Sequence, residues 1–428
     1  MPTLLLSLLL LLSDETLLKD LQALTPLAPT DERTLRAMVE QTLPRVAKVM
    51  HARAPKNPTV KIVSRTAAAG KLKAVLAREY PGDRLARLGA ALKAVHLIEP
   101  QVDLQREALE LYATNVGGFY DPHDRTLYLL ADQPAVMQQL AIAHELAHAI
   151  QDEQLGLERL TREAMRSEDA QLALSAALEG NAQAVAAEVV GADSGDEDGM
   201  AGALIAESTA LSASLAAQAS GVNPWLALQL SFPYEAGAEL VRANATKDDP
   251  AACRLLSRLP ASTAQVLDPA IYRNNQAPLR GSIGLASLLP GTERVYETTL
   301  GRANIDLLAT THDAGRLGEG WRGDVLELVR KGPMQSAAWA IAFKEARQAE
   351  VFARFYSKLL GAKDRVDGTA VEDKEGSISG VIVRGSAALI LIRVPLGRWN
   401  PVVNGWDVFG SATVSAADEA RRPDALRR

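Results

Sequence analysis

Cysteine, histidine and clustered positive charge are all scarce in this chain of 428 residues. The single cysteine, Cys253, excludes an intrachain disulfide framework and any metal site built from several thiolates. The 46 lysines and arginines are outnumbered by 52 aspartates and glutamates and form no basic stripe. Phosphate binding needs clustered cations, so nucleic acid is not an expected partner. Any metal must be held by histidine and carboxylate side chains.

A hydrophobic run long enough to cross a membrane is also missing. Residues 4–12 are apolar apart from Ser7, but a spanning helix needs about 20 apolar residues. We therefore expect no integral membrane segment. Residues 1–20 form a candidate leader, and this favours export to the periplasm or the exterior, with a cytoplasmic location as the alternative. No Lys or Arg precedes the run, so the apolar start of an ordinary helix is the competing interpretation.

The remaining composition is that of a globular protein, with 47% hydrophobic and 23% charged residues. Early in the chain the patterns predict a helix at 30–58, a strand at 60–63, helices to about 114 and a β-hairpin at 117–130. A helix should then run from the cap pair Asp132 and Pro134 to Leu155, where Gly156 stops it. A second long helix is predicted at about 169–190, with Asp169 as its N-cap.

The last part of the chain has a different character, following the acidic, glycine-rich linker at 191–199 and helices to about 260. Two strands, a helix and two more strands make a small ββαββ unit, predicted at 324–329, 337–343, 345–360, 378–383 and 387–394. The tryptophans in the last quarter of the chain are expected to pack in the core of this unit rather than to form a binding platform. We expect a helix-rich α+β fold, with a catalytic region at 30–310 and a C-terminal module at 315–410.

The most specific motif is His144-Glu145-Leu146-Ala147-His148 within a predicted helix. Side chains four residues apart share one helix face, so two imidazoles can reach one Zn²⁺ per chain. Glu145 is offset by one residue and would sit beside the metal, where it can take a proton from the attacking water and pass it to a leaving amine. The competing interpretation is a pair of core histidines or a degenerate metal site.

A catalytic zinc needs a third protein ligand, and Glu179 is the best candidate. Its carboxylate is embedded in an apolar helical stripe, where an unpaired charge is costly and should be neutralised by a metal or another cation. Gly180 beside it would let another helix approach closely. A pairing of Glu179 with Arg or Lys is the alternative, and Glu188 is the fallback ligand.

Other candidate ligands are weaker. Gln151 and Gln154 stand where a metzincin would have a glycine and a third histidine. The other histidines are remote and suit surface or local hydrogen-bonding roles: His51, His96, His123 and His312. Three further glutamates lie in polar stretches and look solvated: Glu158, Glu163 and Glu168.

Two helices that carry His-Glu-x-x-His and then Glu resemble the gluzincins, the thermolysin-like metallopeptidases. The chain is more closely similar to a group of bacterial HExxH proteins, from about residue 60 onward. The shared segments are 118–122, 144–152, 177–182, 232–237, 260–265 and 320–324. The resemblance implies that His144, His148 and Glu179 are zinc ligands and that Glu145 is the general base. It also implies an edge strand at 125–130 whose backbone pairs with an extended peptide or protein substrate.

The sequence departs from that pattern at two positions. Asn181 stands where an aspartate is expected, and Asp268 stands where the group more often has a histidine before a proline. The group that stabilises the oxyanion is therefore open, and three tyrosines could donate the hydrogen bond: Tyr120, Tyr234 and Tyr272. Asp152, one turn after His148, could orient that imidazole or simply end the helix in solvent.

These observations predict a zinc metallopeptidase. One alternative is a gluzincin-like binding or regulatory protein without turnover, although the retained Glu145 argues against it. The other is a zinc amidohydrolase acting on a non-peptide amide, which no sequence feature separates from a peptidase.

Overall fold

The computed structural model describes residues 31–55, 58–114, 118–130, 135–192, 221–362, 369–373, 375–405 and 408–409. The candidate leader, the cap pair Asp132 and Pro134 and most of the acidic linker lie outside these ranges. None of the described helices has the length and hydropathy needed to span a membrane. The chain forms two compact units, and the predicted helix-rich α+β class is confirmed.

The first unit comprises the described residues up to Gly89 together with Glu99–Gln276. Its elements are α2 (Glu32–Val49), β1 (Thr59–Val63), α3 (Arg65–Glu79), the start of α4 (Arg84–Ala94), α5 (Leu104–Thr114), β2 (Gly118–Asp121), β3 (Thr126–Leu130), α6 (Ala135–Leu155), α7 (Leu157–Ala164), α8 (Glu168–Gly191), α10 (Pro224–Asn244), η2 (Cys253–Ser257), α11 (Thr263–Leu267) and α12 (Pro269–Arg273). The domain boundaries inferred from the sequence stay predictions.

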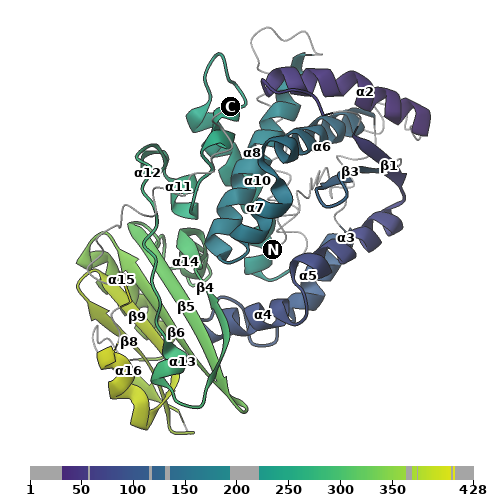
Figure 1. Cartoon of the computed structure of the whole chain (residues 1–428). Coiled ribbons are helices and arrows are strands. Elements are labelled where there is room, and N and C mark those ends of the chain that lie inside the picture. Colours follow the sequence, from purple (N-terminus) through teal and green to yellow (C-terminus); the bar gives the residue numbers. More distant parts are fainter. Residues whose placement is uncertain are drawn as a thin grey trace. The chain divides into compact units, whose positions relative to one another are not determined.

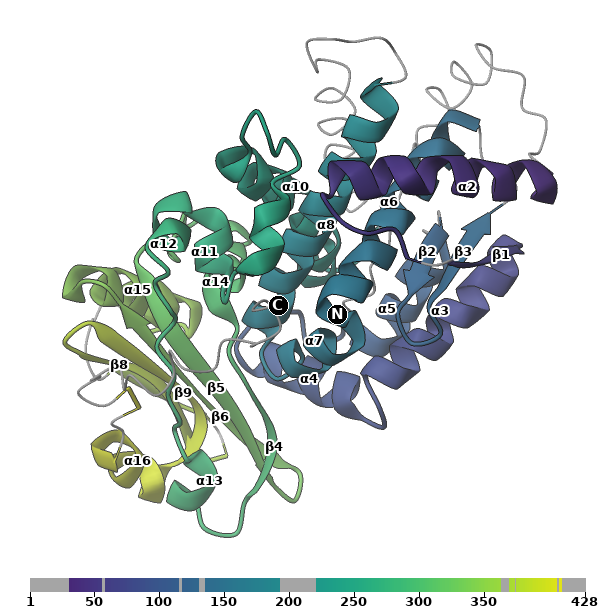
Figure 2. The same ribbon diagram turned by 45° about the horizontal axis from the view of Figure 1, so that its top comes forward.

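A three-stranded sheet in the order β1-β3-β2 lies next to α6 in this unit (Figure 2). The strand β1 pairs in parallel with β3 from Thr59↔Thr126 to Val63↔Leu130, and β2 pairs with the other side of β3. The prediction that the strand at 125–130 is an edge strand is therefore wrong. Both sides of β3 are already hydrogen-bonded, so its backbone cannot accept a substrate strand.

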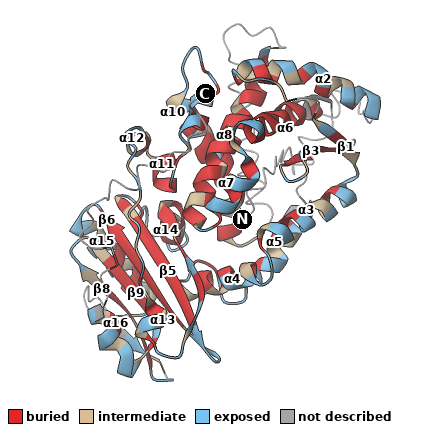
Figure 3. Ribbon diagram, viewed as in Figure 1, coloured by how far each residue is buried: buried red, intermediate tan, exposed pale blue. Residues whose placement is uncertain are grey.

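Helices cover both faces of this sheet. On one face α6 packs against β2 and β3, then α8 packs against α6, and α10 packs against α8 (Figure 1). On the other face α3 contacts β3, with the Lys71 ammonium 5.1 Å from the Tyr128 ring centroid. Figure 3 shows α6 and α8 buried along most of their length. Helices that are apolar nearly all round belong in such a central layer.

The ends of the helices follow local sequence signals. Gly156 is left-handed with φ 66° and terminates α6 at Leu155, as predicted. The N-cap predicted at Asp169 is wrong, because the Ser167 side chain accepts from the backbone N–H of Ala170 and caps α8 two residues earlier. The buried Asp169 carboxylate instead accepts from the backbone N–H and hydroxyl of Thr263. The first helix ends at Val49, well before residue 58.

The second unit comprises Ala90–Ile98 and the described residues from Ala277 onward. Its elements are α13 (Leu285–Leu288), β4 (Glu293–Thr298), α14 (Gly301–Thr310), β5 (Trp321–Lys331), β6 (Met334–Phe343), α15 (Ala346–Leu359), β7 (Thr369–Glu372), β8 (Ser377–Arg384), β9 (Ala387–Pro395), η3 (Leu396–Arg398) and α16 (Trp399–Gly405). The segment Ala90–Ile98 contacts α15 through His96, whose Nδ1 lies 3.2 Å from the Tyr356 hydroxyl.

One antiparallel sheet in the order β4-β5-β6-β9-β8-β7 forms the core of this unit. The predicted ββαββ pattern is confirmed as β5, β6, α15, β8 and β9, whereas the strands β4 and β7 at the two edges were not predicted. The helix α15 covers one face through aromatic contacts with Trp339, and α13 and α16 pack with the apolar residues of the other face.

Asp324 on β5 is a buried carboxylate held by four N–H donors. Its Oδ1 accepts from the Trp321 indole at 3.0 Å and from the Gly301 backbone at 2.8 Å. Its Oδ2 accepts from the Trp339 indole at 2.9 Å and from the Leu300 backbone at 2.9 Å. Trp321 and Trp339 therefore belong to the core, as the sequence favoured.

Candidate metal centre

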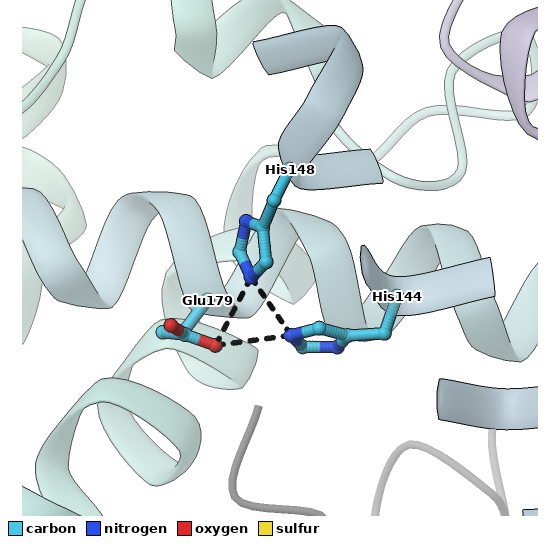
Figure 4. Close-up of side chains that lie close together, drawn as sticks. All are labelled: His144, His148 and Glu179. Atoms are coloured by element: carbon cyan, nitrogen blue, oxygen red, sulfur yellow. Dashed lines mark hydrogen bonds and ion pairs between the residues drawn. The ribbon is translucent and has the colours of Figure 1, made fainter. Parts of the chain in front are cut away.

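His144 and His148 on α6 and Glu179 on α8 point toward one another (Figure 4). The two imidazole Nε2 atoms are 2.9 Å apart. Glu179 Oε2 lies 3.1 Å from the Nε2 of His144 and 3.6 Å from that of His148. All three side chains are buried. The i, i+4 spacing on α6 and the packing of α8 against it thus bring together the three residues that the sequence singled out.

The geometry of this cluster fits one metal ion. Donor atoms about 2.0–2.1 Å from a tetrahedral zinc lie roughly 3.4 Å from one another, close to the separations found here. The ion pairs of Glu179 within the described part of the chain are with the two histidines, so the alternative pairing with Arg or Lys is not what the structure shows. Two imidazoles and a carboxylate are a donor set that suits a divalent transition metal.

The electrostatics of the cluster favour an ionised carboxylate between two imidazoles. Burial lowers the pKa of His144 below its usual value, although Glu179 opposes this effect. Burial also disfavours the charged form of His148, but the Glu179 carboxylate outweighs it and raises the pKa of this residue. The two histidines in turn outweigh the burial of Glu179 and hold its pKa below the usual range. The site thus presents a negative charge where a cation would bind.

Gln151 contacts His148, a role that was not predicted from the sequence. Its Oε1 lies 2.8 Å from Nδ1 of His148, on the side of the ring that faces away from Glu179. It is three residues after His148, a spacing that places both side chains on one helix face and could have identified it. Asp152 was expected either to orient His148 or to end the helix in solvent, but it is buried, and its carboxylate accepts from the Tyr120 hydroxyl and from the backbone N–H of Leu157, both at 2.8 Å.

The remaining predicted site residues are all buried. Glu145 follows His144 on α6 and is fully buried, close enough for its charge to raise the pKa of His148. Tyr234 lies on α10, and the Tyr272 hydroxyl donates to the backbone carbonyl of Arg258 at 2.7 Å. The Tyr120 hydroxyl donates to Asp152, and burial together with the charge of this carboxylate raises the pKa of Tyr120. The catalytic roles of these side chains stay predictions.

The other four histidines are exposed at the surface, as expected, and make contacts outside the metal cluster. These involve the Asp248 carbonyl for His51, the Tyr356 hydroxyl for His96, the Glu158 carboxylate for His123 and the Leu308 carbonyl for His312. Glu158 and Glu163 are exposed as predicted, whereas Glu168 is buried, contrary to its polar surroundings in the sequence. Asp268 caps α12 by accepting from the backbone N–H groups of Ala270 and Ile271.

The chain matches one family model over residues 76–219. The description of that family is "Putative metallopeptidase family (DUF6782)". No curated protein and no solved structure matches the chain in the corresponding comparisons. The matched segment covers less than half of the chain but includes His144, Glu145, His148 and Glu179. The match and the His-His-Glu cluster together suggest a metal-dependent peptidase that acts on peptides or proteins.

Proposed function

We propose that this protein is a zinc-dependent metallopeptidase of the gluzincin type. The observation that carries the proposal is the convergence of His144 and His148 from one helix with Glu179 from a second helix. The match to a metallopeptidase family over the same segment supports it independently of the geometry. Two histidines within a His-Glu-x-x-His helix and a glutamate from a following helix are the arrangement that distinguishes gluzincins from metzincins.

Zinc is the metal that this donor set favours. Imidazole nitrogens bind zinc well, and a catalytic zinc has three protein ligands and one open position. The cluster supplies two nitrogens and one carboxylate, which leaves one position of a tetrahedron for water or substrate. We therefore propose one zinc ion per chain, held by His144, His148 and Glu179.

Glu145 supplies the proton transfer in this proposal. A bound zinc ion would polarise the scissile carbonyl and lower the pKa of water toward neutrality. The Glu145 carboxylate would accept the proton of the attacking water and then deliver it to the leaving amine. Because Glu145 is buried beside His144, its charge acts at short range in a medium of low polarity, where it is effective as a base.

The substrate would bind along the sheet next to α6. Extended peptides commonly add a strand to an exposed sheet edge. Since β3 is central, the edges of the described sheet are β1 and β2. We propose β2, because it packs against α6 and its residue Tyr120 donates a hydrogen bond to Asp152 on that helix.

Metal analysis and peptide cleavage test the proposed function. We expect one zinc per full-length chain and none in the His144→Ala, His148→Ala double variant, with His123→Ala as a matched control at an exposed histidine. Glu145→Gln should keep zinc and lose about 10²–10⁴-fold in the cleavage rate of an unfolded, fluorescently labelled protein substrate. Zinc binding by the double variant would contradict the proposed metal site. Equal cleavage rates for Glu145→Gln and the unmodified protein would contradict the proposed mechanism.

A further inference from the structure

We infer that Gln151, held in place by Asn181, is a positioning residue that fixes which nitrogen of His148 faces the metal. This inference deepens the proposed function and rests on it. The three side chains form a relay that starts at the metal cluster and ends at the backbone of Ala251, just before η2.

The direction of each amide in the relay is set by a backbone carbonyl. Gln151 Nε2 lies 3.0 Å from the carbonyl oxygen of Leu178, and Asn181 Nδ2 lies 2.8 Å from that of Ala251. A carbonyl oxygen can only accept, so the NH₂ group of each amide must face it. The Asn181 Oδ1 then accepts a second hydrogen bond from Gln151 Nε2 at 2.9 Å. Flipping either amide would place two acceptors or two donors against each other.

This orientation determines the tautomer of His148. With both Gln151 hydrogens committed, its Oε1 is an acceptor 2.8 Å from His148 Nδ1, so that nitrogen must carry the proton. The Nε2 of the neutral ring is then a lone pair, and it points toward His144 and Glu179. A metal-ligating histidine needs this arrangement, in which the outer nitrogen donates and the inner nitrogen binds.

Burial makes the relay effective. His148, Gln151 and Asn181 each have 0% of their surface exposed, so water does not compete for these groups. A buried donor or acceptor without its partner is costly, and this penalty enforces the orientation of both amides. The relay also accounts for Asn181, which stands where the related HExxH proteins are expected to have an aspartate. An ionised aspartate there could not donate to the Ala251 carbonyl, and the orientation of Gln151 would lose its second anchor.

The zinc dissociation constant of full-length variants, measured by competition with a chelator, tests this inference. Gln151→Leu removes the acceptor and should weaken zinc binding by about 10–100-fold. Gln151→Glu keeps an oxygen opposite Nδ1 but loses both donated hydrogen bonds. The metal-free variant should therefore have a lower melting temperature, whereas its zinc dissociation constant should stay within about threefold of that of the unmodified protein. Carboxylates serve as the outer partner of many zinc-bound histidines.

Gln171→Leu is the matched control. Gln171 is also a buried glutamine in this unit, but its side chain bonds with the Tyr80 hydroxyl. The Gln171→Leu variant should have a lower melting temperature, and its zinc affinity should stay within about threefold of that of the unmodified protein. The inference is overturned if Gln151→Leu binds zinc as tightly as the unmodified chain, or if Gln171→Leu weakens binding as much as Gln151→Leu.

A measurement on the unmodified protein does not depend on the folding of any variant. In the zinc-loaded, ¹⁵N-histidine-labelled protein, the His148 proton should reside on Nδ1, with zinc on Nε2. Zinc on Nδ1 would overturn the inference while leaving the zinc site intact. A chain that binds no zinc at all would instead overturn the proposed function, and the inference with it.

Discussion

Gly180 on α8 and Gly237 on α10 meet backbone to backbone, one residue after the proposed ligand Glu179. A methyl group at Gly180 would lie 2.7 Å from the Cα of Gly237 and still closer to its carbonyl group. A methyl group at Gly237 would lie 3.1 Å from the Cα of Gly180 and closer still to the Ala176 carbonyl oxygen. The close helix approach that the sequence predicted at Gly180 is therefore confirmed, and α10 is the helix that approaches.

Alanine at either glycine should push α8 and α10 apart. We expect Gly180→Ala and Gly237→Ala each to lower the free energy of unfolding by about 1–3 kcal/mol, as overpacking does in other cores. Gly70→Ala is the control, because this exposed position within α3 has nothing within 4 Å of the added methyl group. It should be neutral or stabilise by up to about 1 kcal/mol. Denaturant unfolding measures all three, and equal effects at the three positions would contradict the close packing.

Replacement of Glu179 should show whether its carboxylate binds the metal directly or is only a charge near the site. Glu179→Gln keeps the shape of the side chain but removes the anionic oxygen that lies near both histidines. We expect zinc affinity to fall by more than the roughly 10–100-fold loss typical of a group outside the coordination shell. Glu188→Gln, on the same helix and only partly buried, should bind zinc like the unmodified protein. The opposite ranking in a chelator titration would assign the third ligand to Glu188.

We expect the carboxylate of Asp324 to be essential for the stability of the second unit and to have no effect on metal binding. Asp324→Asn would turn an NH₂ group toward two of its four N–H donors, at a cost on the order of 3 kcal/mol. Asp313→Asn, in an exposed turn, should change stability by no more than about 0.5 kcal/mol. Tryptophan fluorescence can follow unfolding, since four of the five tryptophans lie beyond residue 320. A loss of bound zinc in folded Asp324→Asn would mean that this unit contributes to the site.

Two of the three candidate tyrosines should prove dispensable for turnover. The hydroxyls of Tyr120 and Tyr272 already donate to Asp152 and to the Arg258 carbonyl. We expect Tyr120→Phe and Tyr272→Phe to lose about 1–2 kcal/mol of stability and to change kcat by less than about threefold. Loss of an oxyanion donor would cost about 10²–10³-fold in kcat. A loss of that size in either variant would identify the stabilising group, and its absence would leave Tyr234 to be tested.

The parts of this structure that the sequence predicted depend on short-range patterns. The spacing of His144 and His148 requires only a helix, and Gly156 ends that helix through its left-handed conformation. Glu179 was identifiable because a carboxylate within an apolar stripe needs a cation nearby. In each case the informative pattern lies within a few residues of the group concerned.

The parts that were missed depend on contacts between distant segments. The central place of β3 follows from its pairing with β1, more than 60 residues earlier, which no local pattern reveals. The N-cap at Ser167 was missed because Asp169 is an equally good cap by residue type, and its partner Thr263 lies 94 residues away. Asn181 likewise acquires its role from Ala251, 70 residues later.

The segment Ala90–Ile98 has a consequence for how this protein can be divided. It lies within the sequence of the first unit but belongs to the second, so the chain passes between the units three times. A protease that cuts near residue 276 would produce a C-terminal fragment without this segment and an N-terminal fragment that exposes Val95, Leu97 and Ile98, all buried in the intact protein. Such fragments should remain associated after cleavage, and recombination at a single junction would not transfer either unit intact to another protein.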